Sequence, residues 1–174
     1  KSILKTPLDG AKISSNFGAE IDIRTKDSDL ILSHDPFIKG DKLKDYLEHY
    51  NHKTLVLNLK EAGIEDDVLS LVKKYSIKSY FLLDVEMPYI YTATRNGQKN
   101  IAVRFSEYEN ISLAKYFINK LKWVWIDTVT KLPINKNNKN ILNKFKSCIV
   151  CPERWGRKQD IKIYKKKLKK IKFE

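Results

Sequence analysis

Two acidic residues and one basic residue alternate with apolar residues near the start of the chain. Glu20, Asp22 and Arg24 are separated by isoleucines. Because successive side chains of a β-strand point to opposite faces, the three charged groups share one face. Carboxylates at this spacing converge on one point, which suits a hard cation such as Mg²⁺ or Ca²⁺. An edge strand with a solvated face, or an ion network of Glu20 and Asp22 with Arg24, explains the pattern equally well.

A histidine follows the next apolar run. Residues 30–33 are Leu-Ile-Leu-Ser, and His34-Asp35-Pro36 comes directly after them. An imidazole at a strand end is a natural general acid or base near neutral pH. A lone histidine is also often structural, and Asp35 either orients the ring or caps the following turn. His49 and His52 fall in a polar stretch and are predicted to be surface residues.

Short apolar runs alternate with amphipathic stretches along the rest of the chain, and these predict the elements that position the polar residues. We predict strands at residues 19–25, 30–34, 54–59, 79–83, 101–105, 123–126, 147–151 and, more briefly, 171–173. Helices are predicted at residues 42–50, 65–75, 88–95, 111–121, 139–145 and 160–170. Alternation of this kind predicts βαβ units and a parallel sheet.

Two architectures fit these units: an open doubly wound sheet and a (β/α)₈ TIM barrel. A barrel usually takes about 250 residues, so this chain of 174 residues would form one that is incomplete or lacks terminal strands. The sequence contains no G-x-G-x-x-G or G-x-x-x-x-G-K loop, which disfavours the nucleotide-binding folds. No break in composition divides the chain, and we predict a single domain over residues 1–174.

The charge of +13 comes from 34 basic and 21 acidic residues. Lysine supplies nearly all of the basic charge, whereas arginine is the usual residue for phosphate and base recognition. We therefore expect no nucleic-acid partner, and we interpret the densest run, residues 165–170, as the solvated face of a helix. No apolar run approaches the roughly 20 residues that span a bilayer. Without an apolar signal segment at the start, the expected location is cytoplasmic.

The only cysteines, Cys148 and Cys151, form a C-x-x-C pair. Zinc needs four ligands, and no second Cys or His pair follows at a suitable spacing. We therefore predict that both are small buried hydrophobic residues of a protein in a reducing compartment.

Three short segments together resemble the signature of the glycerophosphodiester phosphodiesterase superfamily, which shares its barrel with phosphatidylinositol-specific phospholipase C. They are Glu20-x-Asp22, Lys26-Asp27 and His34-Asp35-Pro36. Residues 58–60, Asn-Leu-Lys, stand where that family has Glu-x-Lys at a strand end. Segments 104–107 and 152–157 are similar to later strand-end segments of a divergent member.

The resemblance implies a (β/α)₈ barrel that hydrolyses a small phosphodiester with Mg²⁺ or Ca²⁺ as cofactor. It assigns metal binding to Glu20, Asp22 and Asn58, and catalysis to His34 and Lys60, with Lys60 pairing with phosphate charge. The substrate-binding residues that it suggests are Arg104, Glu153 and Arg157. For Arg104, an ion pair with Asp127 or Glu107 is the alternative interpretation.

The sequence departs from the family pattern at two points. The family's His-Arg pair is absent, so either it precedes Lys1 in the natural protein, whose first residue here is not Met, or it is lost. Asn58 replaces a glutamate and removes one negative charge, for which Glu153 or Asp84 would substitute. These departures favour an alternative function, a catalytically degenerate module that binds a phosphate or a polyol. The oligomeric state is not predicted.

Overall fold

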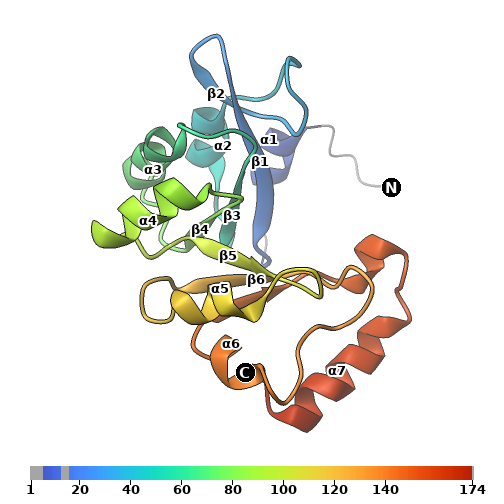
Figure 1. Ribbon diagram of the computed structural model, residues 1–174. Coiled ribbons are helices and arrows are strands. Elements are labelled where there is room, and N and C mark those ends of the chain that lie inside the picture. Colours follow the sequence, from blue (N-terminus) through green and yellow to red (C-terminus); the bar gives the residue numbers. More distant parts are fainter. Residues whose placement is uncertain (1–5, 13–15, 174) are drawn as a thin grey trace. The chain divides into compact units, whose positions relative to one another are not determined.

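The computed structural model describes residues 6–12 and 16–173. The chain divides into two compact units, Lys1–Tyr89 and Ile90–Glu174, and each unit has its own sheet (Figure 1). The single-domain organisation stays a prediction, because compact units of this kind occur within domains as well as between them.

A four-stranded mixed sheet forms the centre of the first unit, with the strand order β2-β1-β3-β4. Its strands are β1 (Ala19–Lys26), β2 (Asp29–Leu32), β3 (Leu55–Leu59) and β4 (Tyr80–Leu83). Its helices are α1 (Pro7–Ala11), α2 (Leu43–His49) and α3 (Glu65–Lys74), and α4 (Met87–Arg95) begins here and continues into the second unit. The sheet is parallel from β1 through β3 to β4.

The two strands that carry the sequence signature form a hairpin. β2 runs antiparallel to β1, and Asp27 and Ser28 alone connect the paired residues Lys26 and Asp29. Both connecting residues have positive φ, 49° and 67°, as the type I′ hairpin turn requires. A parallel pair needs a crossover of about a dozen residues, so this short link enforces the antiparallel direction.

The core of the first unit lies between the sheet and its helices. All five residues of β3 are buried, and α2 and α3 lie on one side of the sheet (Figure 1). Leu43 and Leu47 of α2, with Val68 and Val72 of α3, are almost fully buried. The loop before α2 is fixed by Gly40, where a Cβ would lie 2.1 Å from the Leu32 carbonyl oxygen.

The second unit contains a three-stranded parallel sheet in the order β5-β6-β7. The strands are β5 (Ala102–Phe105), β6 (Trp123–Ile126) and β7 (Lys146–Ile149). The α-helices are α5 (Ile111–Tyr116), α6 (Lys139–Leu142) and α7 (Asp160–Ile171), and a 3₁₀ helix, η1, covers Pro152–Trp155. Val124 and Ile126 of β6, with Leu142 of α6, are fully buried.

The prediction of a (β/α)₈ barrel is wrong. The described strands form a mixed four-stranded sheet and a separate three-stranded sheet, and neither closes into a barrel. β4 and β5 follow one another in the chain but are not hydrogen-bonded neighbours. The predicted strand at 171–173 is also wrong, because α7 continues to Ile171 and Lys172 caps it with a left-handed φ of 53°.

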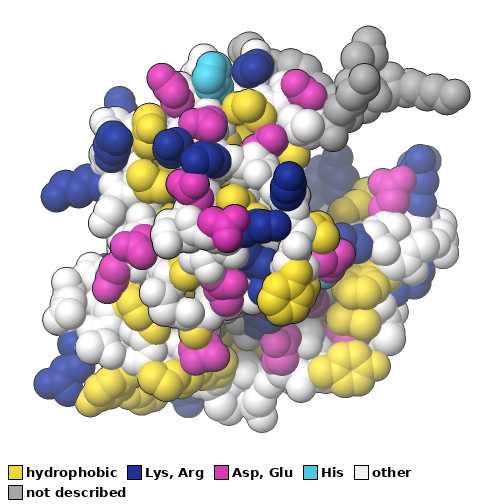
Figure 2. Space-filling view, turned by 90° about the horizontal axis from the view of Figure 1, so that it is seen from above, with side chains coloured by type: hydrophobic (Ala, Val, Ile, Leu, Met, Phe, Trp, Pro, Cys, Tyr) yellow, Lys and Arg dark blue, Asp and Glu magenta, His cyan; other side chains and the backbone are white. Residues whose placement is uncertain are grey.

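Two further sequence predictions concern single residues and the surface. Cys148 is half-buried, but Cys151 is exposed, so the prediction of burial is wrong for Cys151. On the face shown in Figure 2, Lys and Arg side chains are interspersed with Asp and Glu. Within the described ranges, no helix is long and apolar enough to cross a membrane.

Candidate functional site

Polar side chains from three parallel strands gather at one edge of the first sheet. Asp22 of β1 and Asn58 of β3 are partners in the strand register. Lys60 comes directly after β3, and Asp84 directly after β4. The carboxyl ends of parallel strands meet at one edge, so residues far apart in sequence form one cluster there.

Lys60 connects the three strands through ion pairs. Its Nζ lies 3.2 Å from Asp22 Oδ1 and 3.8 Å from Asp84 Oδ2, and only 17% of its side chain is exposed. The ion network predicted for Glu20 and Asp22 with Arg24 is not found among the described residues, because Lys60 rather than Arg24 pairs with Asp22. Arg24 instead contacts Glu61, at 3.7 Å, and donates from Nε to the His34 carbonyl oxygen at 3.0 Å.

Asn58 connects Glu20 to the site. Its Nδ2 donates to Glu20 Oε1 at 3.2 Å, and the residue is only 5% exposed. Its Oδ1 is buried and has no hydrogen-bond partner among the described residues. An unsatisfied buried acceptor costs about 1–3 kcal/mol, and a cation beside Asn58 would satisfy it.

The donors of Glu20, Asp22 and Asn58 fit a hard divalent cation, because all are oxygens and two are carboxylates. Over residues 6–12 and 16–173, no three His, Cys, Asp or Glu side chains are placed to hold one ion. The candidate set therefore depends on the amide oxygen of Asn58 as its third donor.

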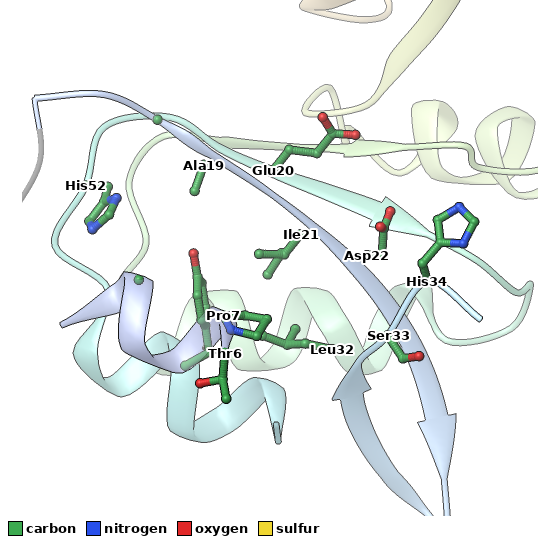
Figure 3. Close-up of a pocket in the computed structure, with 13 residues that line it drawn as sticks. Thr6, Pro7, Ala19, Glu20, Ile21, Asp22, Leu32, Ser33, His34 and His52 are labelled. Atoms are coloured by element: carbon green, nitrogen blue, oxygen red, sulfur yellow. The ribbon is translucent and has the colours of Figure 1, made fainter. Parts of the chain in front are cut away.

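A cavity of about 550 Å³ adjoins this cluster. Glu20 and Asp22 line it together with Ser33 and His34, and its apolar lining includes Ile21, Leu32 and Tyr46. Figure 3 shows Asp22 and His34 near one end of the cavity and His52 near the other. Figure 3 also shows the carboxylates of Glu20 and Asp22 on the opposite side of β1 from Ile21 and Leu32, so they point away from the apolar part of the cavity.

His34 is held by its neighbour but stays open to solvent. Its Nδ1 lies 2.8 Å from Asp35 Oδ1, and 69% of its side chain is exposed. Of the two roles that sequence analysis gave Asp35, the structure shows the orienting one.

Two residues near the site were not recognised from the sequence. Glu61 Oε1 accepts the backbone N–H of Thr25 at 2.8 Å and also its hydroxyl, which fixes the end of β1. His52 was predicted at the surface, but it is half-buried, with its ring 5.1 Å from that of Tyr50. An acid directly after Lys60 was the available signal for Glu61, whereas the burial of His52 depends on tertiary packing.

The suggested substrate-binding residues lie in the second unit, and their side chains are bound within it. Arg104 donates to Asp127 Oδ2 at 2.5 Å, as the ion-pair interpretation predicted. Arg157 donates to Asp160 at 3.1 Å and to the carbonyl oxygens of Thr128 and Val129. Both guanidinium groups thus stabilise loops after strands.

Glu153, the third of these residues, is a surface residue on η1. Its Oε1 lies 3.5 Å from the Nζ of Lys158, and 55% of its side chain is exposed. Asp84, the other substitute acid, belongs to the cluster around Lys60 in the first unit.

Comparison with protein-family models finds no match, and comparisons with curated proteins and with solved structures find none either. The resemblance described above therefore rests on the residues of this chain.

Proposed function

We propose that the chain is a metal-dependent phosphodiester hydrolase of glycerophosphodiester phosphodiesterase type, acting on a small phosphodiester and releasing an alcohol. The supporting observation is the cluster at the carboxyl ends of β1, β3 and β4. It combines the carboxylates of Glu20, Asp22 and Asp84 with a buried amide oxygen that has no partner among the described residues and with an ammonium group. These are the groups needed to hold a cation and to bind a phosphate beside it.

Glu20, Asp22 and Asn58 would hold Mg²⁺ or Ca²⁺, which when bound supplies a Lewis acid that neutralises phosphate charge. Lys60 lies between two acids from different strands, and its ammonium binds a phosphate oxygen.

His34 moves the proton in this proposal. Its hydrogen bond to Asp35 favours the tautomer with the proton on Nδ1, so Nε2 accepts a proton from the attacking water or substrate hydroxyl. The same nitrogen then donates that proton to the leaving alcohol as its bond to phosphorus breaks. We further propose a cytoplasmic location and no nucleic-acid substrate.

The exposure of His34 favours a second candidate function. The His34 side chain is 69% exposed. An imidazole in contact with bulk water is a weaker acid–base catalyst than one in an enclosed site. The second candidate is a module that binds a phosphate or polyol at the same cluster without cleaving it.

Hydrolysis of a phosphodiester panel, headed by glycerophosphodiesters, tests the proposal when measured with Mg²⁺ or Ca²⁺. We expect metal-dependent turnover that falls about 100-fold or more in His34→Ala, the usual contribution of a general acid or base. His49→Ala is the matched control, because among the described residues the His49 ring is hydrogen-bonded within its own helix, with Nδ1 2.9 Å from the Asp45 carbonyl oxygen. Turnover that survives His34→Ala contradicts the assignment of His34.

Thermal melts test the metal site, and together with the turnover measurement they separate the two candidate functions. Mg²⁺ or Ca²⁺ should raise the Tm of the natural protein, and Asp22→Asn should abolish that increase. An increase in Tm with either cation, without any turnover, supports the binding module. A Tm that changes with neither cation argues against a metal site.

A further inference from the structure

The outer face of α7 is a dense row of lysines. Six lysines lie within its twelve residues, and all six are exposed: Lys162, Lys165, Lys166, Lys167, Lys169 and Lys170. None of the salt bridges between described residues includes any of them, and the acid of the helix, Asp160, pairs with Arg157 at 3.1 Å. The charge of this face is therefore uncompensated within the described chain.

Packing of the opposite face fixes this orientation. Tyr164 is 7% exposed, and Leu168 and Ile171 are half-buried, so one side of α7 packs on the second unit. Lys162, Lys166 and Lys170 follow one another at i, i+4 spacing on the other side, where like charges destabilise a helix. A partner that neutralises this row would relieve the repulsion.

The chemistry of the face favours a lipid surface over a nucleic acid. α7 contains lysine but no arginine, whereas arginine dominates specific contacts to phosphates and bases. Ile163 lies among the lysines and is 47% exposed, and Ile161 is 36% exposed. Exposed aliphatic groups beside lysines suit the headgroup region of a membrane.

We propose that α7 docks this molecule on anionic phospholipid bilayers. Each lysine near such a surface adds to the electrostatic attraction, so several together give reversible peripheral binding. The proposal depends on α7 alone and is independent of the activity of the first unit.

Co-sedimentation of the full chain with vesicles tests this. One set contains phosphatidylcholine only, and the other also contains phosphatidylserine. We expect binding only to the second set, and binding that weakens as salt is added, because salt screens exposed charges. The triple variant Lys162→Glu, Lys166→Glu and Lys170→Glu should bind at least tenfold more weakly.

The control variant carries the same change of charge in the first unit. Lys53→Glu, Lys73→Glu and Lys78→Glu replace exposed lysines there, and this variant should keep most of the binding. Equal losses in the two variants would show dependence on net charge alone and overturn the proposal. Equal binding to vesicles with and without phosphatidylserine would also overturn it. So would tighter binding to duplex DNA or RNA than to the vesicles. A second variant carries Lys→Gln at the same three positions of α7. It should also bind more weakly, and an unchanged circular dichroism spectrum would show that the loss of binding does not come from unfolding.

Discussion

Asn58 is the residue on which the cation proposal depends most directly. Its amide donates to Glu20, while its buried oxygen lacks a partner among the described residues. A side chain in this position holds one carboxylate of the site and presents a neutral ligand to a cation. Its substitution therefore changes the stability of the site and its affinity for cations in opposite directions.

Asn58→Asp should lower stability without a cation by about 1–3 kcal/mol, because a donor to Glu20 becomes a like charge. With Mg²⁺ or Ca²⁺ present, the Tm increase should exceed that of the natural protein, because a carboxylate replaces the amide among the proposed cation ligands. Thermal melts at increasing cation concentration measure both effects. Asn51→Asp, at an exposed loop position, is the control, and an equal cation response in the two variants contradicts the proposed site.

Glu107 gives the second unit a predicted pH dependence. Burial alone would raise the pKa of Glu107, but hydrogen bonds from the Thr130 hydroxyl and from the backbone N–H groups of Thr130 and Lys131 hold it below its ordinary value. A lowered pKa in the folded state gives stability that is present above the unfolded pKa and lost as pH falls through the folded one.

Glu107→Ala should therefore lower the free energy of unfolding by about 1–3 kcal/mol at neutral pH. The difference should shrink below about pH 4.3, the ordinary pKa of a glutamate. Urea unfolding at a series of pH values measures this. Glu107→Gln should show a smaller loss that does not depend on pH, and a constant difference for Glu107→Ala would contradict the assignment.

At the scale of elements, the loop from β2 to α2 is set by a close backbone approach. Leu32 N–H donates to the Asp41 carbonyl oxygen at 2.8 Å, and Gly40 passes beside Leu32 with no room for a side chain. This contact fixes the segment that carries His34.

Gly40→Ala should lower stability by about 1–3 kcal/mol, the usual range for overpacking, because the new Cβ meets a carbonyl oxygen that cannot move freely. Gly10→Ala is the matched control. A Cβ there meets no atom within 4 Å, and alanine in α1 should stabilise by about 0.5–1 kcal/mol. Denaturant unfolding of both variants measures the two effects, and a neutral Gly40→Ala would show that the loop adapts.

Most elements could be predicted from the sequence, but their pairing could not. The apolar runs at residues 54–59 and 123–126 are short and bounded by polar residues, so β3 and β6 lie where expected. The shared face of Glu20 and Asp22 follows from strand alternation. The pairing of Lys60 with Asp22 depends on how β1 and β3 align, and nothing local in either strand determines that alignment.

At the scale of the whole molecule, the described strands form two sheets, because β4 and β5 follow one another in the sequence but do not pair with each other. Alternating strands and helices predict parallel pairing, but whether a sheet continues, closes or ends depends on contacts along its entire edge. This is why the barrel prediction failed while the individual strands were found.

The distribution of tryptophan allows the two units to be followed separately. Trp123, Trp125 and Trp155 are all of the tryptophans in the chain, and all lie in the second unit. We expect Mg²⁺ or Ca²⁺ to shift urea unfolding followed by circular dichroism and to leave the tryptophan fluorescence midpoint unchanged. Transitions that coincide and shift together would show that the units unfold as one.

The position of Lys60 between Asp22 and Asp84 means that the site carries its own counter-ion. Under the proposed cation binding, an incoming divalent ion would compete with this tethered ammonium for Asp22, and selectivity would arise from that competition as well as from the number of ligands. Monovalent ions offer no more charge than the lysine already supplies and gain little by replacing it. A divalent ion does gain, and the displaced ammonium is then available to an anionic ligand, so cation and anion would bind cooperatively.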